Sequence, residues 1–112
     1  MSFSFGDICL IRFPFTDAIG VKKRPALLLA TDAEGDGIFL RITTKLGHSE
    51  KEVSIEKWRE SGLLAPSCIR TGKFATLNLS LIEKKLGSLA EDDRAALLAA
   101  LAAWVEHLGT LR

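Results

Sequence analysis

The sequence predicts a mainly β protein with one C-terminal α-helix, built as a small, strongly bent antiparallel sheet or barrel. Short runs of β-branched and aromatic residues recur between glycine and proline turn signals. Only the last segment, residues 91–107, has clear helical periodicity. Strands and helices do not alternate, which argues against a parallel α/β sheet. We therefore expect the terminal helix to plug a small barrel.

Length and composition predict one soluble domain spanning residues 1–112. A chain of 112 residues, 47% hydrophobic and 26% charged, is enough for one core and too short for two. The start MSFSFGD lacks the pattern of a signal peptide, and no apolar stretch reaches the roughly 20 residues of a membrane span. Cys9 and Cys68 are far apart in sequence, so we expect reduced thiols in the core of a cytoplasmic protein.

The first half of the chain predicts three strands. Residues 8–13 form the first strand, which Pro14 ends because proline cannot donate to a ladder. Residues 15–23 then form a loop, and the continuous apolar run 25–30 indicates a strand buried on both faces. A turn over DAEGDG leads to a third strand at residues 38–43, which pairs with the second as a hairpin.

The second half predicts shorter elements. After a loop at 46–52 come a strand at 53–55 and one helical turn at 56–61, ended by Gly62. Two short β segments, 67–70 and 73–77, are split by Thr71-Gly72, and a further strand-like segment covers 81–86.

The terminal helix, residues 91–107, predicts one apolar stripe for the core or for a dimer contact. We expect Ser88 or Ala90 as its N-terminal boundary; Ser88 with Glu91 would form a capping box, and the macrodipole favours acids in the first turn. The stripe consists of Leu97, Leu101, Trp104 and Leu108, widened by Leu98 and Val105.

The basic run Lys22-Lys23-Arg24 predicts an anion-binding site. The net charge is only +1, so any affinity for nucleic acid must come from a local patch. A hairpin connection is usually short and carries few charges, whereas this one carries three cations. A polyanion such as RNA is a reasonable ligand for such a cluster.

Four sequence blocks resemble, in register, the MazF/PemK (Kid) family of type II toxin–antitoxin ribonucleases. These blocks are GDICLIRFPFTD, KKRPALLLAT, RITTK and PSCIRTGKFATLNLSLIEKKLGSL, and they span the chain from Gly6 to the terminal helix. The resemblance implies an SH3-like barrel related to the plug-in-barrel gyrase poisons. It also implies a homodimer, sequence-specific cleavage of single-stranded mRNA, and an antitoxin partner that occludes the RNA site.

The motif match also suggests site residues. Arg24 resembles the family's catalytic arginine before proline, Thr43 its catalytic threonine, and Arg70 an arginine near the active cleft. Gly72 departs from the pattern, because related members often carry an aspartate there, and this leaves the general base unassigned. The RNA-binding set expected around these catalytic residues is Lys22, Lys23, Thr44, Lys45, His48 and Lys73.

The implied chemistry is attack of the RNA 2′-hydroxyl on the adjacent phosphorus. Such a step needs removal of the hydroxyl proton, stabilisation of the phosphorane and protonation of the 5′-oxygen. Arg24 suits the phosphorane because a guanidinium binds two phosphate oxygens in one plane. Arg70 contributes charge, since arginine stays protonated. We expect no cofactor and no metal, because His48 and His107 are not spaced with carboxylates as ligands.

Other interpretations of the same residues stay open. Without the family resemblance, Arg24 is a solvated loop cation and Thr43 an ordinary strand residue. Phe13 and Phe15 would stack bases if exposed, although a strand phenylalanine is more often core. Gly72 favours a non-catalytic barrel that binds RNA or inhibits a protein target such as gyrase. A plain SH3-like interaction domain is the third interpretation.

Overall fold

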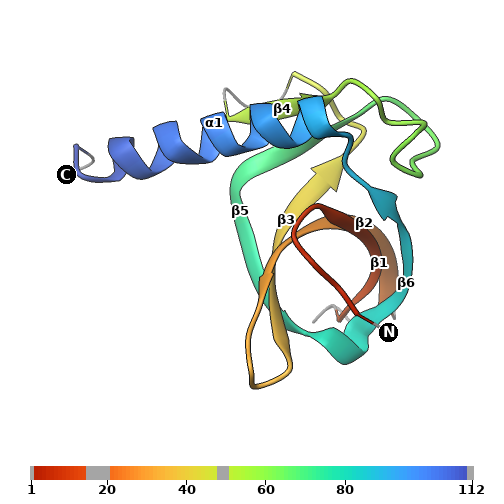
Figure 1. The fold of residues 1–112 in the computed structure, drawn as a ribbon. Coiled ribbons are helices and arrows are strands. Elements are labelled where there is room, and N and C mark those ends of the chain that lie inside the picture. Colours follow the sequence, from red (N-terminus) through yellow and green to blue (C-terminus); the bar gives the residue numbers. More distant parts are fainter. Residues whose placement is uncertain (1, 15–20, 48–50, 111–112) are drawn as a thin grey trace.

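The computed structural model describes residues 2–14, 21–47 and 51–110 as one curled sheet followed by a helix (Figure 1). Every strand pair is antiparallel, and the sheet order is β4-β5-β3-β2-β1-β6. The mainly β class with a C-terminal helix is thus confirmed. The elements are β1 (Asp7–Pro14), β2 (Val21–Thr31), β3 (Asp36–Thr43), β4 (Glu52–Ile55), β5 (Ser67–Asn78), the 3-10 turn η1 (Leu79–Leu81), β6 (Ile82–Ser88) and α1 (Glu91–Leu108).

The sheet curls like a small barrel but does not close. In Figure 1, β1, β2, β3, β5 and β6 bend around a common centre. Among the described residues, the two edge strands β4 and β6 are not hydrogen-bonded to each other. The expected barrel is therefore an open, strongly curved sheet.

The bend in β5 comes from a bulge centred on Gly72. Leu40 pairs with Phe74, and the next residue of β3, Arg41, pairs with Arg70, so residues 71–73 are extra on the β5 side. Gly72 has φ +97°, a backbone conformation that side chains other than glycine rarely adopt. The two predicted segments 67–70 and 73–77 are the two arms of this single bent strand.

β2 begins earlier than predicted. Its first residue is Val21, so Lys22 and Lys23 lie in a strand and not in the predicted loop. The remaining loop positions, 15–20, fall outside the described residues. The predicted burial on both faces is confirmed for Ala26, Leu27 and Leu28, which are fully buried.

The two faces of the sheet pack into two separate hydrophobic clusters, because neighbouring residues of a strand point to opposite faces. The cluster on the helix side, here the helix-side core, holds Ile8, Leu27, Leu40, Ile42, Val53, Ile55, Leu63, Ile69, Leu89 and Leu97. The other, here the inner core, holds Cys9, Ile11, Ala26, Leu28 and Phe39, with Phe3, Phe13, Leu77, Leu79, Leu81 and Ile82 against it. The inner core draws on β1, β2, β3, β5, η1 and β6 and so fills the inside of the curl.

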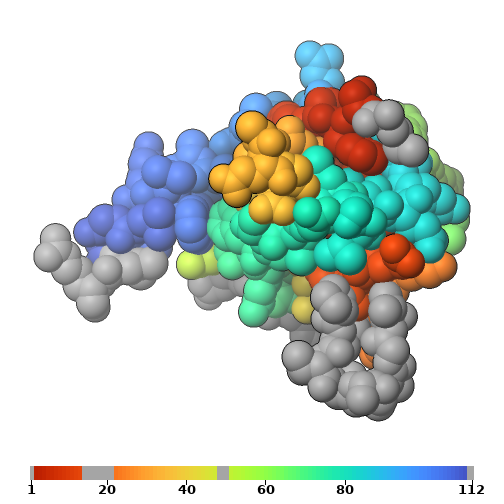
Figure 2. Space-filling model, turned by 90° about the horizontal axis from the view of Figure 1, so that it is seen from below, coloured from red at the N-terminus to blue at the C-terminus, as the bar shows by residue number. Residues whose placement is uncertain are grey.

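Helix α1 packs on the sheet through residues up to Trp104, and its last turn extends beyond these contacts. Leu97 is fully buried and Leu101 packs partly on the helix-side core, whereas Leu98, Val105 and Leu108 are exposed. Figures 1 and 2 show the C-terminal half projecting beyond the sheet. The helix was expected to plug the barrel. Instead, side chains of the inner core fill the inside of the curled sheet, and the helix packs on the helix-side core.

The predicted capping box at Ser88 is also wrong. The N-cap is Ala90, the other of the two expected boundaries, without a side-chain cap, and Ser88 is the last residue of β6. The Ser88 hydroxyl instead donates to Oδ1 of the buried Asp7, at 3.0 Å. Asp7 also accepts from the Ser4 backbone N–H at 2.8 Å. The Asp7 carboxylate thus accepts the hydroxyl hydrogen bond of Ser88 and links the N-terminal segment to β6.

The turn predicted at residues 56–61 has an α-helix-type hydrogen bond, from Ser61 N to Lys57 O at 3.1 Å, but forms no helix. Asp93 of α1 is 2% exposed and accepts from the backbone N–H groups of Glu56 at 3.1 Å and Lys57 at 3.0 Å. This acid was expected to serve the helix dipole. It also fastens the helix to the turn.

Both cysteines are buried with free thiols, as predicted. Among the described residues, no helix is both long enough and apolar enough to span a membrane.

Candidate nucleic-acid interface

Strand register places Arg24 and Thr43 on one face of the sheet. Arg24 of β2 lies opposite Ile11 of β1, and Ala26 lies opposite Arg41 of β3. Side chains two residues apart on a strand share a face, so Arg24 follows Ala26 and Thr43 follows Arg41 onto the inner-core face. The end of this face beyond the inner core is therefore polar.

A small polar pocket collects these side chains. It has a volume of about 160 Å³, and Thr43 and Thr44 supply hydroxyls beside two arginines. The Lys45 backbone N–H donates to Thr43 Oγ1 at 3.1 Å, so the hydroxyl proton remains available to a ligand oxygen. The lining residues are Arg24, Pro25, Arg41, Ile42, Thr43, Thr44, Lys45 and Ser67.

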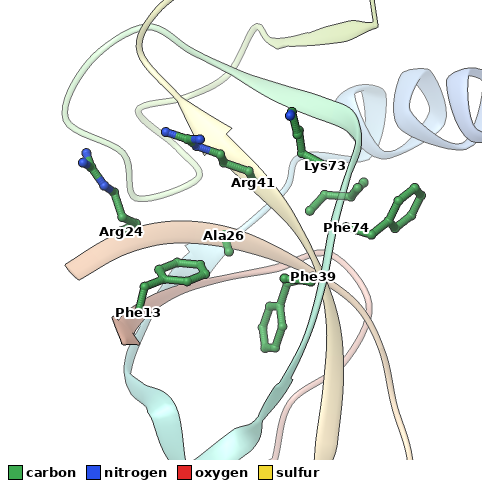
Figure 3. Close-up of a pocket in the computed structure, with 9 residues that line it drawn as sticks. Phe13, Arg24, Ala26, Phe39, Arg41, Lys73 and Phe74 are labelled. Carbon is green, nitrogen blue, oxygen red and sulfur yellow. The ribbon is translucent and has the colours of Figure 1, made fainter. Parts of the chain in front are cut away.

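A second pocket adjoins it and is mostly apolar. This aromatic pocket has a volume of about 250 Å³, and Arg24 and Arg41 line both pockets. In Figure 3, Phe13 and Phe39 lie below the cationic side chains of Arg24, Arg41 and Lys73. The lining residues are Phe13, Arg24, Ala26, Phe39, Leu40, Arg41, Lys73, Phe74 and Ala75.

Arg41 is the site residue that the sequence interpretation missed. It is exposed, and Figure 3 shows its side chain extending towards Arg24. Its position in β3, two residues before Thr43, was the available signal, because strand alternation puts both on one face. Phe13, predicted to stack bases if exposed, is half-buried in the aromatic pocket. Phe15 lies outside the described residues.

Arg70 neighbours the two pockets without lining either. It lies opposite Arg41 across the β3–β5 ladder and opposite Glu52 across the β4–β5 ladder. Its Nε atom is buried without a hydrogen-bond partner within the described part of the chain. Arg70 instead lines a hollow of about 340 Å³ that also contains Lys73 and Trp104.

The expected RNA-binding lysines divide between the two faces of the sheet. Lys23 alternates with Arg24 and points away from the pockets, where its ammonium pairs with Glu83 of β6 at 2.8 Å. The hydrogen bond from Lys23 lowers the pKa of the Glu83 carboxyl. Lys22 shares the face of Arg24 and is exposed.

The other expected residues are placed as follows. Lys73 lines the aromatic pocket, and Thr44 and Lys45 line the polar pocket. His48 lies outside the described residues.

Neither thiol is suited to nucleophilic chemistry. Burial, with a further contribution from the Asp7 charge, raises the pKa of Cys9 to about 11. Burial and the neighbouring Glu52 carboxyl also raise the pKa of Cys68. A thiol must ionise to attack, so both cysteines act as packing residues at neutral pH.

One group of carboxylates, Asp32, Glu34 and Asp36, gathers in the turn between β2 and β3. The Asp32 side chain accepts from the backbone N–H groups of Glu34 at 2.9 Å and Asp36 at 3.0 Å. These bonds stabilise the turn and account for the aspartate there. The group lies at the opposite end of the hairpin from Arg24 and Thr43.

Comparison with known families gives one match over most of the chain. The model of the PemK-like, MazF-like toxins of type II toxin–antitoxin systems matches residues 4–105. No curated protein sequence matches significantly.

Solved structures of toxins have the same fold. The MazF-mt6 toxin of Mycobacterium tuberculosis has a TM-score of 0.71 at 20% identity, covering 89% of this chain and 96% of the toxin. The MazE–MazF structure from Deinococcus radiodurans gives 0.76 at 16% identity, covering 95% and 98%. An endoribonuclease in complex with its cognate antitoxin, from a mycobacterial species, gives 0.75 at 16% identity, covering 94% and 96%.

Proposed function

This chain belongs to the PemK-like, MazF-like toxins of type II toxin–antitoxin systems, and from that membership we propose that it is an endoribonuclease that cleaves single-stranded RNA. The observation that carries the proposal is the polar pocket, in which Arg24 and Thr43 meet from different strands. A guanidinium and a hydroxyl on one small concave surface match the needs of a phosphate group.

The proposed reaction is attack of the RNA 2′-hydroxyl oxygen on the adjacent phosphorus. The P–O bond to the 5′-oxygen breaks, which leaves a 2′,3′-cyclic phosphate and a 5′-hydroxyl. No metal is needed to generate the nucleophile, because the substrate itself carries it. The cations of the pocket supply the positive charge that a metal would otherwise provide.

Arg24 and Thr43 have separate roles in this proposal. Arg24 donates in-plane hydrogen bonds to two non-bridging oxygens, and its charge stabilises the phosphorane more than the ground state. Thr43 donates its hydroxyl proton to a phosphate oxygen and so holds the phosphate in position. Arg70 acts at longer range by charge, since it lies one strand beyond Arg41. Gly72 has no side chain to act as a base, so the base is assigned to no residue.

The partners proposed are those of the family and of its structural neighbours. Two of these neighbours were solved as complexes with their antitoxins. We propose that an antitoxin covers the two pockets and thereby blocks RNA, and that the toxin acts as a homodimer. The exposed leucine and valine side chains on the projecting half of α1 offer apolar surface for such contacts.

Cleavage of a mixed-sequence RNA in EDTA tests the enzymatic function. We expect cyclic-phosphate ends with the natural protein and a rate at least ~100-fold lower for Arg24→Ala, the usual scale for losing one transition-state donor. Lys23→Ala is the matched control, because it removes a neighbouring cation from the opposite face. Absence of Arg24-dependent cleavage across several RNAs would contradict the proposal.

Gly72, which stands where related members often carry an aspartate, favours one competing function, a non-catalytic barrel that binds RNA or inhibits a protein target such as gyrase. Measuring the growth of cells that express the protein separates the nuclease from this competing function. A nuclease loses toxicity with Arg24→Ala, whereas persistent growth arrest by this variant would support the competing function.

A further inference from the structure

We propose that Glu52 is a positioning residue of the polar pocket, because its carboxylate holds the segment after β3 so that Thr44 and Lys45 face a bound RNA phosphate. This inference deepens the proposed function and rests on it, since the phosphate belongs to the same RNA.

The segment after β3 supplies part of the polar pocket but has little buried surface of its own. Thr44 and Lys45 line the pocket, and residues 44–47 are all exposed. An exposed segment with few apolar contacts opens easily, so its conformation depends on its hydrogen bonds. One of these bonds is local and runs from the Lys45 backbone N–H to Thr43 Oγ1, at 3.1 Å.

A second hydrogen bond fixes the segment at Gly47. The Gly47 backbone N–H donates to Glu52 Oε2 at 3.0 Å. Gly47 has φ +77°, a left-handed conformation typical of turns. A hydrogen bond to an ionised acceptor is roughly twice as strong as one between neutral groups, so the Glu52 carboxylate is well suited to hold this turn.

Glu52 is itself held by the sheet. It is the first residue of β4, is half-buried and lies directly opposite Arg70 of β5. Opposite charges in this arrangement attract. Burial, followed by the charge and the hydrogen bond of the Glu52 carboxyl, raises the pKa of the Cys68 thiol. Cys68 in turn lies opposite Thr43 of β3. Glu52 therefore joins Gly47, at the far end of the segment, to the strand pair that carries Thr43.

The charge of Glu52 acts against RNA binding. Residues directly opposite each other on paired strands share a face, so Glu52 lies on the same face as Arg70 and Arg41. A carboxylate on this face repels an RNA phosphate, and its removal would tighten binding if charge were its only effect. Loss of a positioning residue has the opposite effect, because the pocket loses its shape once Thr44 and Lys45 are released.

Binding of uncleavable RNA to two Glu52 variants measures this sign. Short 2′-O-methyl oligonucleotides lack the nucleophilic hydroxyl, so their affinity, measured by fluorescence anisotropy at fixed ionic strength, does not depend on turnover. We expect Glu52→Ala to bind roughly 5-fold more weakly than the natural protein, the scale of one lost hydrogen bond. Glu52→Gln removes the same charge but keeps an acceptor oxygen for Gly47, so its affinity should equal or exceed that of the natural protein.

Glu34→Ala is the control for charge. It removes a carboxylate from the turn between β2 and β3, at the opposite end of the hairpin from the polar pocket. Salt screens exposed charges at such separations, so its affinity should stay within about two-fold of the natural value.

A double-mutant cycle with Lys45 tests how the effect reaches the RNA. Lys45→Ala should weaken binding in the natural protein but much less in the Glu52→Ala background, where Lys45 is already released. Additive losses would show that the two residues act independently and would overturn the inference.

Amide hydrogen exchange of the free protein examines the segment without RNA. Exchange of the Gly47 N–H should be roughly 5-fold faster in Glu52→Ala and close to natural in Glu52→Gln. Thermal melts establish that both variants are folded.

The outcomes separate this inference from the proposed nuclease. Natural or tighter RNA binding by Glu52→Ala, binding by Glu52→Gln as weak as that of Glu52→Ala, or unchanged Gly47 exchange in Glu52→Ala would overturn the inference alone. A natural protein that binds no RNA would contradict the proposed function and the inference with it.

Discussion

Arg41 of β3 and Arg70 of β5 lie directly opposite each other across an antiparallel ladder. Like charges in this arrangement repel, and a cross-strand pair of this kind changes stability by roughly 0.2–1 kcal/mol. The register therefore sets two cationic side chains on neighbouring strands, and we expect their repulsion to lower the stability of the free protein. A polyanion bound over this face would reverse that cost.

Arg41→Gln should accordingly stabilise the free protein while weakening RNA binding. We expect the free energy of unfolding to rise by ~0.5 kcal/mol at low salt, and the gain to shrink at high salt because counterions screen the repulsion. Urea unfolding at two salt concentrations measures this. Lys23→Gln is the control, since it breaks the ion pair with Glu83 and should not stabilise. A destabilising effect of Arg41→Gln at low salt would contradict the prediction.

The salt dependence of RNA binding should identify which lysines contact phosphates. Each phosphate contact to single-stranded nucleic acid contributes about 0.7 to the slope of log affinity against log salt. Lys45→Ala and Lys73→Ala remove cations that line the two pockets, so each should reduce the slope by about this amount. Lys23→Ala should leave the slope unchanged, because Lys23 lies on the opposite face. Anisotropy titrations across a salt series measure the three slopes, and an equal loss in all three would contradict the assignment.

The cation cluster shows how far the sequence determines the site. Lys22, Lys23 and Arg24 are adjacent, and a loop would have allowed all three to face one ligand. In the structure they belong to β2, and strand alternation sends Lys23 to the other face. The composition of the run indicated an anion site. Which of its members face the site depends on the strand boundary and register, and local sequence defines these poorly.

Arg41 and Ser88 illustrate two other limits. Arg41 joins the site only because β3 lies beside β2 in the register that sets it opposite Ala26, which is a long-range property. Ser88 fits the local pattern of a helix cap, but its hydroxyl donates to the buried carboxylate of Asp7, which is far away in sequence. The strands themselves were predictable, because alternation and glycine or proline boundaries are local signals. Gly72 was recognised as a break between segments, and its positive φ explains why.

Gly62 and Gly87 should be sensitive to the addition of a single methyl group. A Cβ at Gly62, where φ is +90°, would lie 2.1 Å from the Leu86 carbonyl oxygen, and a Cβ at Gly87 would lie 2.3 Å from the Ser61 carbonyl oxygen. Both clashes involve backbone, which cannot move aside, so we expect Gly62→Ala to destabilise by roughly 3 kcal/mol or more.

Gly109→Ala is the matched control for this substitution. Gly109 has no heavy atom within 4 Å of the added Cβ and φ −69°, so alanine should be neutral or stabilise by roughly 0.4–1 kcal/mol. Thermal unfolding of the two variants makes the comparison. Similar melting temperatures would show that the 56–62 turn does not need its close approach to β6.

The buried Cys9 thiol should make stability fall at alkaline pH. Burial raises the pKa of Cys9 from 9.0 to about 11, with Asp7 raising it further and Lys85 lowering it. Above pH 9 the thiol ionises in the unfolded chain but stays protonated in the folded protein, so the unfolded state binds fewer protons. The free energy of unfolding therefore decreases with pH between about 9 and 11, by roughly 2–3 kcal/mol in total for a shift of this size. Below pH 9 the contribution is fully present.

Urea unfolding of the natural protein and of Cys9→Ala at a series of pH values isolates this contribution, because the other titrating groups are common to both proteins. The stability difference between the two should narrow as the pH rises through this window, whereas a constant difference would show that Cys9 ionises equally easily in the folded state.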